Sequence, residues 1–276
     1  MKYSFRQLCE IIEGEVISSS NPDAVIEHIS TDSRSIHHPE GSIFFAIKST
    51  NGNGHHYIKE CFDKGIKYFV IEEHSPLVNL KNTNCLLVKN SVEALQKIAT
   101  YHRQQFNIPV IGITGSNGKT TTKEMIASIL EQKSSCLSTK GTLNNHLGVP
   151  LTLLGMAKTH WAAVVEVGAN HPGEVTELAK IVCPTVGVVT NAGAEHLEGF
   201  GTLEGAARAE GELFAALDKS AAAVMNADDE FYDLWKGMNR AERALSFGLR
   251  ETADIRPVGP IERSGVAGER QSFTAM

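Results

Sequence analysis

The hydrophobic pattern of the chain changes near residue 108. From there on, apolar runs alternate with segments of helical periodicity, which is typical of a doubly wound, mostly parallel sheet with helices on both faces. The apolar runs predict strands over 110–114, 162–167, 186–190, 222–225 and 245–247. Apolar residues at helical spacing predict helices between them, over 120–132, 173–182, 203–217 and 229–238.

Before residue 108 the elements are shorter and mixed. Apolar runs predict strands over 42–47, 68–71 and 86–88, and a helix over 57–64 is followed by a glycine suited to a C-cap. A longer helix is predicted over 91–106, with Ser91 as its N-cap. We therefore predict an α/β protein with a small mixed α/β N-terminal domain over 1–83, a linker helix over 84–107 and a doubly wound domain over 108–276.

Composition narrows the class of protein. Of the 276 residues, 42% are hydrophobic and 21% are charged, as in ordinary globular proteins. The formal net charge of −6, without runs of like charge, argues against a nucleic-acid-binding surface. The five cysteines form no Cys-x-x-Cys pair, and no stretch reaches the roughly 20 apolar residues of a membrane span. We expect a cytoplasmic monomer with reduced thiols and no membrane insertion.

Isoleucine and alanine are unevenly distributed. Residues 1–138 contain 17 Ile and 5 Ala, whereas residues 139–276 contain 3 Ile and 21 Ala. The change falls inside the predicted second domain, not at the linker. Two origins fit this pattern: drift between domains, or recombination of two sequences.

The strongest local signal follows the first predicted strand of the second domain. There the chain has a G-x-x-G-K-T pattern between a strand and a helix. Gly115 and Gly118 allow the backbone to approach phosphate oxygens closely. Lys119 supplies a positive charge for the β- and γ-phosphates, and the Thr120 hydroxyl can bind Mg²⁺. The strict motif has a further glycine where this chain has Ile113. The pattern nevertheless predicts a nucleotide-binding phosphate loop.

Two further polar residues lie at or after predicted strands of the same sheet. Glu166 comes at the end of one strand, and His196 lies a few residues after the next. Parallel strands bring their carboxyl ends to one edge, so we expect both residues near the phosphate loop. A carboxylate and an imidazole suit a divalent ion. Each alone would more often be a buried polar residue with its hydrogen bonds satisfied, but their shared placement favours a metal site.

Several stretches of the chain resemble the Mur ligases, the ATP-dependent enzymes that form amide bonds in peptidoglycan precursor synthesis. In the predicted second domain these stretches are 114–120, 143–154, 166–174 and 189–201. The run Ala-Asn-His-Pro-Gly-Glu over 169–174 is similar to the MurF type and distinguishes it from sister ligases such as folylpolyglutamate synthase. In the predicted first domain, 30–34 and 41–46 resemble the UDP-sugar-binding module of that family.

This resemblance implies ATP and Mg²⁺ as cofactors and a role for particular residues. ATP contacts are implied for Thr114, Gly115, Ser116, Asn117, Gly118, Lys119, Thr120 and Thr121. Metal ligands are implied at Thr120, Glu166 and His196, and substrate contacts at Ser33, Arg34, Asn170 and His171. Catalytic roles are implied for Lys119, Asn145, His196 and Glu210, with Asn144 or Asn145 near the γ-phosphate and acyl group.

The resemblance also implies an activity. ATP would phosphorylate the terminal carboxylate of a UDP-MurNAc-tripeptide, and the amine of D-alanyl-D-alanine would then displace phosphate from the acyl phosphate. The third, C-terminal domain of the family has no counterpart in the sequence, so we also keep an alternative. In this alternative the chain binds a nucleotide and a UDP-sugar without turnover of its own.

One position departs from the family pattern. In the helix predicted over 203–217, the family usually carries a lysine that is carbamylated and bridges metal ions, whereas this chain has Glu210. Two interpretations remain open at this point. Glu210 either supplies its own carboxylate to the second metal ion or is a solvated helix residue.

Overall fold

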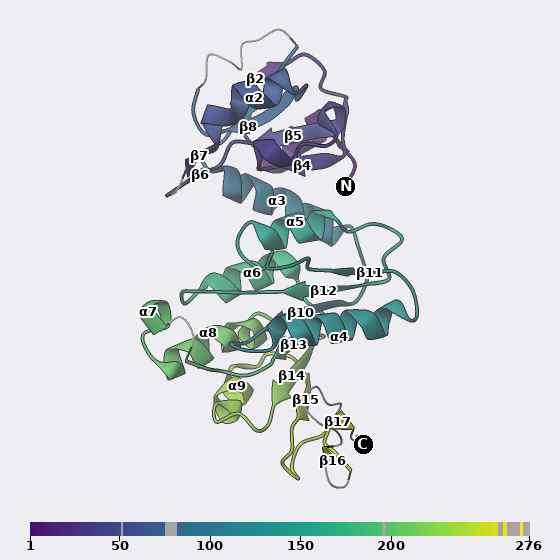
Figure 1. The fold of residues 1–276 in the computed structure, drawn as a ribbon, viewed down its shortest axis with the longest axis vertical. Coiled ribbons are helices and arrows are strands. Elements are labelled where there is room, and N and C mark those ends of the chain that lie inside the picture. Colours follow the sequence, from purple (N-terminus) through teal and green to yellow (C-terminus); the bar gives the residue numbers. More distant parts are fainter. Residues whose placement is uncertain (51, 75–81, 195–196, 259–261, 264–270, 273–276) are drawn as a thin grey trace. The chain divides into compact units, whose positions relative to one another are not determined.

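The computed structural model describes residues 1–50, 52–74, 82–194, 197–258, 262–263 and 271–272 (Figure 1). The chain forms two compact units. The first comprises Met1–Asn107 and His146–Lys158, and the second comprises Ile108–Asn145 and Thr159–Met276. Residues 84–107, predicted as a linker, therefore cluster with the first unit, and so does 146–158, which the sequence division assigns to the second domain.

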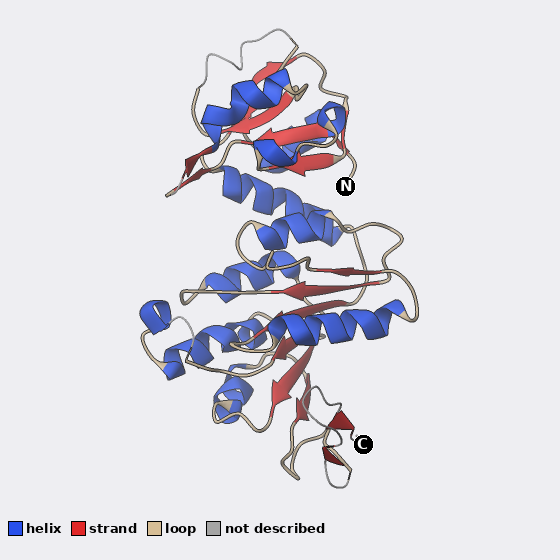
Figure 2. Ribbon diagram, in the orientation of Figure 1, coloured by secondary structure: helices blue, strands red, loops and turns tan. Residues whose placement is uncertain are grey.

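The first unit contains a mixed five-stranded sheet (Figure 2). Its strand order is β2 (Glu15–Ser19), β9 (Asn84–Leu87), β8 (Tyr68–Ile71), β5 (Ser42–Phe45) and β4 (His28–Ser30). The pairing of β2 with β9 is antiparallel and the others are parallel. Two short pairs accompany it, β1 (Tyr3–Ser4) with β3 (Val25–Ile26) and β6 (Lys48–Ser49) with β7 (Gly52–Asn53). The helices are α1 (Phe5–Ile12), α2 (Ile58–Asp63), α3 (Ser91–Gln104) and α5 (Gly148–Leu154).

The start of α3 corrects one prediction. Asn90, not Ser91, is the N-cap, because its side chain accepts hydrogen bonds from the amides of Val92 and Glu93. Ser91 instead is buried in the first turn, where its amide donates to Glu72 Oε1 at 2.8 Å. Asn and Ser are both favourable N-cap residues. The hydrogen bond from the Ser91 amide to Glu72 places Ser91 in the first turn, and Asn90 is therefore the cap.

The second unit contains a six-stranded sheet in which every described pairing is parallel. Its strand order is β11 (Cys136–Ser138), β12 (Ala162–Glu166), β10 (Val110–Thr114), β13 (Val186–Val189), β14 (Ala222–Asn226) and β15 (Arg243–Phe247). The helices are α4 (Lys119–Glu131), α6 (Glu174–Val182), α7 (Leu197–Phe200), α8 (Leu203–Ala215) and α9 (Tyr232–Met238). A short pair, β16 (Glu262–Arg263) with β17 (Gln271–Ser272), follows.

The strand order determines where the helices lie. After β10, α4 leads toward β11 at one end of the sheet, whereas α6, α8 and α9 lead toward β15 at the other. Because such crossovers are right-handed, α4 covers one face and the other three helices cover the opposite face. This arrangement, a small mixed α/β domain followed by a doubly wound domain, confirms the predicted fold class.

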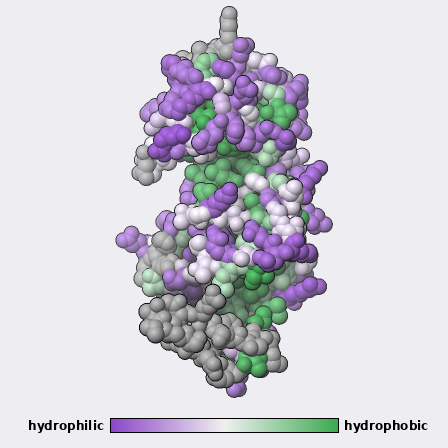
Figure 3. Space-filling view, turned by 45° about the vertical axis from the view of Figure 1, so that its right-hand side comes forward, coloured by the Kyte–Doolittle hydropathy of each residue, from purple (hydrophilic) through white to green (hydrophobic). Residues whose placement is uncertain are grey.

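On the face drawn in Figure 3, the part of the first unit at the top of the view is mostly hydrophilic, with apolar areas among and below the polar side chains. Its interior is formed by fully buried apolar residues of the sheet and of α2, among them Phe44, Ile58 and Phe69. Within the described residues, no helix combines the length and the apolar character that crossing a lipid bilayer requires.

Candidate active site

The phosphate loop has the backbone geometry that its glycines predict. Gly115, directly after β10, has φ 129°, and a Cβ there would lie 2.1 Å from Thr190 Oγ1. Gly118 has φ 82° and is the N-cap of α4, with no side-chain cap. The first amides of a helix have no partner within the helix, so they form an anion site in front of α4.

The segment after β13 holds this loop in place. The Ser116 amide donates to Asn191 O at 2.9 Å, and the Asn117 amide donates to Asn191 Oδ1 at 3.0 Å. Thr190 Oγ1 and Asn191 Nδ2 both donate to Asn117 O, at 2.7 and 2.8 Å. The Gly193 amide donates to Ser116 Oγ at 2.7 Å. The loop is therefore preformed, and sequence reasoning missed the role of Thr190 and Asn191.

Lys119 is the first residue of α4, and its side chain folds back over the phosphate loop. Its ammonium group donates to the carbonyl oxygens of Gly115 and Ser116, the latter at 3.1 Å. These carbonyls hold the charge over the loop, where a phosphate could replace them as acceptors. Thr121, which was predicted to contact ATP, is exposed in the first turn of α4.

Glu166 joins three elements at the sheet edge. It ends β12, pairs with Ile113 in register and is 2% exposed. Its Oε2 accepts from Thr120 Oγ1 at 3.0 Å, and its Oε1 accepts from Asn144 Nδ2 at 2.9 Å. Both donors are neutral. These donors do not neutralise the negative charge of the buried carboxylate, whereas a divalent cation bound there would do so.

A buried lysine supports the segment that carries Asn144. Lys123 is fully buried and donates from Nζ to Thr139 O at 2.7 Å. The hydroxyl of Thr139 accepts from the Glu166 amide at 3.0 Å. Asn145, which was predicted to be catalytic, is exposed, and the described contact to Glu166 comes from its neighbour Asn144.

Glu210 lies beneath the phosphate loop and is 5% exposed. Its Oε2 accepts from the Thr114 hydroxyl in a short hydrogen bond and from the Gly115 amide at 2.8 Å. It is therefore not a solvated helix residue. The structure brings Thr114 to Thr120, Glu166 and Glu210 together, whereas His196 lies outside the described residues. Within the described residues, no group of three or more His, Cys, Asp or Glu could hold a metal ion.

The two candidate substrate residues of this unit lie in an exposed loop after β12. The amides of Asn170 and His171 donate to Glu174 Oε2 at 2.7 and 3.3 Å, and His171 Nδ1 lies 3.2 Å from Glu174 Oε1. Burial raises the pKa of Glu174, but these hydrogen bonds outweigh it and hold that pKa below its usual value. The loop is thus fixed by an ionised carboxylate, which leaves the exposed side chains of Asn170 and His171 accessible.

Ser33 and Arg34 lie in the first unit, in a short 3₁₀ turn over Ser33–Ser35. Arg34 Nη2 lies 2.6 Å from Asp32 Oδ2, and the hydrogen bonds from Arg34 lower the pKa of Asp32 to about 2. Ser33 is buried, and its carbonyl accepts from Lys64 Nζ at 2.8 Å. The guanidinium is largely exposed, so the turn presents an Arg34–Asp32 ion pair to solvent.

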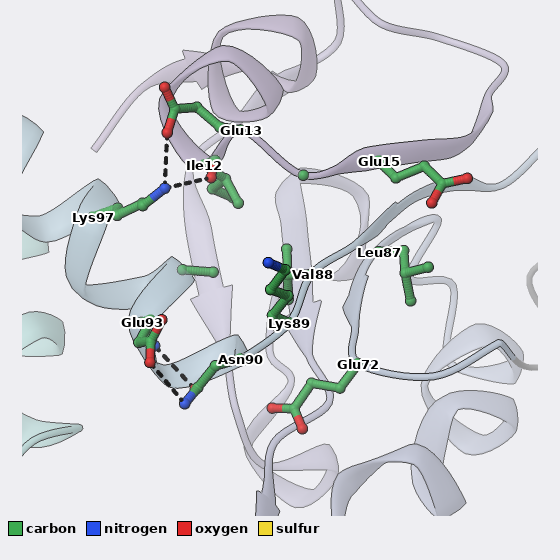
Figure 4. Close-up of a pocket in the computed structure, with 12 residues that line it drawn as sticks. Ile12, Glu13, Glu15, Glu72, Leu87, Val88, Lys89, Asn90, Glu93 and Lys97 are labelled. Carbon is green, nitrogen blue, oxygen red and sulfur yellow. Dashed lines mark hydrogen bonds and ion pairs between the residues drawn. The ribbon is translucent and has the colours of Figure 1, made fainter.

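Each unit also contains a cavity. In the first unit a cavity of about 560 Å³ lies among α1, β2, β9 and α3 (Figure 4). At its edge Lys97 Nζ donates to Ile12 O at 3.1 Å and to Glu13 Oε2 at 2.9 Å. Neither Ser33 nor Arg34 lines this cavity.

The cavity of the second unit is next to the phosphate loop. It has a volume of about 590 Å³ and is lined by Asn117 and Gly118 of the loop, by apolar residues of the sheet and of α4, and by Asn226 and Phe247. This volume leaves room beside the loop for a ligand larger than phosphate. No sequence pattern indicated Asn226 or Phe247 as a site residue.

Comparison with known proteins agrees with this geometry. The family model described as the Mur ligase middle domain matches residues 113–270. The chain belongs to the Mur ligase family. Within this family of ATP-dependent amide ligases it is of the MurF type, as the relatives show. The matched residues contain the phosphate loop and most of the doubly wound unit, and they also include 146–158 of the first unit.

The relatives cover both units of this Mur ligase chain. The UDP-N-acetylmuramoyl-tripeptide--D-alanyl-D-alanine ligases of Haemophilus influenzae and Escherichia coli are each 36% identical to it over 86% and 87% of its length. The crystal structure of MurF from Acinetobacter baumannii matches with a TM-score of 0.88 and 31% identity, covering 100% of this chain and 61% of that one.

A nucleotide complex is among the similar structures. MurF ligase from Thermotoga maritima in complex with ADP matches with a TM-score of 0.77 and 30% identity, covering 90% of this chain and 55% of that one. The chain spans about half the length of the curated relatives it matches, 51% for the ligases of H. influenzae and E. coli.

Proposed function

We propose that this chain provides the ATP site and the UDP-sugar-peptide site of a ligase that joins D-alanyl-D-alanine to UDP-MurNAc-tripeptide. The observation that carries the proposal is the meeting of Thr120, Asn144 and the buried carboxylate of Glu166 directly beside the phosphate loop. The names of the similar ligases supply the substrates. Such a reaction belongs to the synthesis of cell-wall precursors.

The proposed chemistry has two steps. The γ-phosphoryl group passes from ATP to the terminal carboxylate of the tripeptide, which gives an acyl phosphate and ADP. The amine of D-alanyl-D-alanine then attacks the acyl carbon, the bond from that carbon to the phosphate oxygen breaks, and the amine loses a proton. The new bond is an amide, and inorganic phosphate leaves.

The residues of this chain would act by positioning and by charge. Lys119 would exchange the carbonyls of Gly115 and Ser116 for β- and γ-phosphate oxygens, and the first amides of α4 would bind the same phosphates. Thr120 and Glu166 have the hard oxygen donors that Mg²⁺ requires, and they would hold it. When bound, Mg²⁺ neutralises phosphate charge. Asn144 would keep the Glu166 carboxylate oriented.

Exposed side chains in each unit are proposed substrate contacts. Arg34, in the 3₁₀ turn of the first unit, presents an exposed guanidinium suited to a diphosphate. Asn170 and His171 expose side chains on the loop that Glu174 fixes. His196 and Asn145 remain predicted catalytic residues in this proposal.

An ADP-release assay on the 276-residue chain tests the proposal. UDP-MurNAc-tripeptide is added with and without D-alanyl-D-alanine, and the binding of each ligand is measured in parallel by calorimetry. Binding of Mg-ATP and of the UDP-sugar-peptide supports the two sites. Absence of both would contradict the proposal.

A second candidate function is binding without turnover. It is favoured by the share of the relatives that this chain spans, which is about half. Under this proposal the 276-residue chain binds both ligands but transfers no phosphoryl group and forms no amide. Turnover near the rate of a full-length relative would contradict it.

A further inference from the structure

Two carboxylates on α8 hold two different loops of the site. Glu210 accepts hydrogen bonds at the start of the phosphate loop, as described above. Glu212, two residues later, accepts from the Gly173 amide at 2.7 Å through Oε1. Its Oε2 accepts from the amide and the hydroxyl of Thr176, at 3.0 Å each. Residues two apart on a helix are rotated by about 200°, so the two side chains leave opposite sides of α8.

Glu212 caps the N-terminus of α6 from another helix. The N-cap of α6 is Gly173, which has φ 92° and no side chain to accept from the first amides. Those amides need acceptors, and a negative charge is favourable at a helix N-terminus. Glu212 supplies these acceptors from a neighbouring helix, and its charge adds to those of Glu174 and Glu177 in the first turn of α6. The start of α6 therefore depends on α8.

The start of α6 in turn fixes the loop before it. Glu174, the first residue of α6, accepts from the amides of Asn170 and His171. A chain of hydrogen bonds therefore runs from Glu212 through the first turn of α6 to these two candidate substrate residues. Displacement of that turn would displace the loop.

Helix α8 has little freedom to move between these two contacts. Gly211 lies between the glutamates, and a Cβ there would lie 2.7 Å from Met238 Sδ and 2.8 Å from Trp235 Cδ1. Trp235 is fully buried, and its Nε1 donates to Ala207 O at 2.8 Å. The backbone of α8 is thus packed directly against α9 at the point where both carboxylates depart.

We propose that Glu210 and Glu212 are positioning residues that fix two loops of the site to one rigid helix, α8. Glu210 sets the start of the phosphate loop, and Glu212 sets the loop over 168–173. The nucleotide part of this inference rests on the ATP site proposed above. Phosphoryl transfer needs its reacting groups aligned closely, and a single support for both loops keeps their separation constant.

Amide hydrogen exchange of the ligand-free chain tests the proposal without any nucleotide. Glu210→Gln is expected to speed exchange of the Gly115 amide at least about tenfold, because a charge-assisted hydrogen bond weakens, and to leave the Gly173 amide unchanged. Glu212→Gln is expected to do the reverse. The control is Glu204→Gln, an exposed position on the same helix that pairs with Arg208. Unchanged exchange at both amides in both variants would overturn the proposal.

ADP affinity with and without metal separates positioning from metal binding. If Glu210 positions the loop, Glu210→Gln weakens ADP binding about tenfold both in EDTA and in Mg²⁺. A loss confined to Mg²⁺ would assign Glu210 to the metal site and overturn the proposal. If the wild-type chain binds no ADP, the proposed function fails, while the exchange result still decides the role of the two carboxylates.

A second variant keeps the test valid if Glu210→Gln does not fold, as judged by circular dichroism. Thr114→Val removes the hydroxyl donor from the same contact and preserves side-chain shape. It is expected to speed exchange at Gly115 and to weaken ADP binding in EDTA. A folded Thr114→Val chain with neither effect would contradict the role of Glu210.

Discussion

The Thr120 hydroxyl lies 3.0 Å from Glu166 Oε2, so the first turn of α4 and the carboxyl end of β12 meet at one carboxylate. The parallel pairing of β12 with β10 produces this contact, because it places Glu166 opposite Ile113, one residue before the end of β10. A hydroxyl and a carboxylate oxygen at this separation are two hard donors beside the phosphate loop. Binding of a phosphate and binding of a cation would therefore affect each other through this pair.

Glu166→Gln should make the ligand-free chain more stable and its nucleotide binding insensitive to Mg²⁺. The substitution keeps the shape of the side chain but removes a buried charge whose two donors among the described residues, Thr120 and Asn144, are neutral. We expect the midpoint of thermal unfolding to rise by about 2–4 °C, which corresponds to about 1 kcal/mol in a domain of this size. Calorimetry with ADP in EDTA and in Mg²⁺ measures the second effect.

The matched control for this prediction is Glu177→Gln, at an exposed position of α6. It should leave both the unfolding midpoint and the Mg²⁺ dependence unchanged. A lower midpoint for Glu166→Gln would show that the carboxylate is stabilised by its surroundings, and the argument for a cation there would fail.

Lys119→Ala should abolish measurable ATP binding and leave the fold intact. The ammonium group now donates to two loop carbonyls, and phosphate oxygens would replace these acceptors. Charge-assisted hydrogen bonds contribute about 1.5–3 kcal/mol each, which corresponds to at least a tenfold loss of affinity. Titration calorimetry with Mg-ATP measures the loss, and Lys219→Ala, an exposed lysine of the same unit, is the control. Equal affinity in the Lys119 variant would remove this residue from the site.

Gly115→Ala should destabilise the chain more than Gly118→Ala. Both glycines have positive φ, which costs an alanine about 1–2 kcal/mol. At Gly115 the new methyl group would also meet an atom, Thr190 Oγ1 at 2.1 Å, whereas no atom of the described residues lies within 4 Å at Gly118. Urea unfolding of the two variants compares these costs directly. Equal losses would show that Thr190 moves aside and that the close approach is unimportant.

The stability of the first unit should fall as the pH drops below about 6.5. His102 is buried, and burial lowers its pKa from the ordinary value of 6.5. Its Nε2 lies 2.9 Å from Met156 O, so Nε2 carries the proton and Nδ1 accepts from the Tyr3 hydroxyl at 2.8 Å. In the unfolded chain the His102 imidazole binds a proton near pH 6.5, whereas in the folded chain it does so only at lower pH. The free energy of unfolding therefore falls as the pH drops from 6.5 toward the lower pKa of the folded state.

His102→Gln tests this origin of the pH dependence. Its amide can donate to Met156 O and its carbonyl can accept from Tyr3, but it does not titrate. Urea midpoints between pH 7.5 and pH 5 should fall less steeply in this variant than in the wild type. Tyr101→Phe, a neighbouring half-exposed position, should keep the wild-type slope. Parallel slopes for wild type and His102→Gln would assign the pH dependence to other groups.

The fold was predictable where local sequence determines an element. Strands β8 and β10 begin and end where their apolar runs do, since central strands of a parallel sheet are buried on both faces. Helix α1 was missed although its signal is local: Ser4 and Gln7 form a capping box. Strand β11 and helix α5 have three and seven residues, too few to establish a period against their surroundings.

The site was predictable only in part for the same reason. The phosphate loop is one continuous motif, and each of its residue types has a chemical reason to be there. The contact of Glu210 with Thr114 joins residues 96 positions apart, so no local pattern reveals it. The support of Asn117 by Thr190 and Asn191 likewise exists only once β10 and β13 have paired.

Because residues 146–158 belong to the first unit, the second unit is not one continuous segment of the chain, and this limits which fragments of the protein can fold. The backbone passes between the two units three times, after Asn107, after Asn145 and after Lys158. A piece made of residues 108–276 would carry α5 without α3, the helix that it contacts, and the buried Val149 and Leu153 of α5 would lose that partner. We expect such a piece to aggregate, whereas joining residue 145 to 159 through a short glycine-rich bridge would give a soluble fragment that retains the phosphate loop.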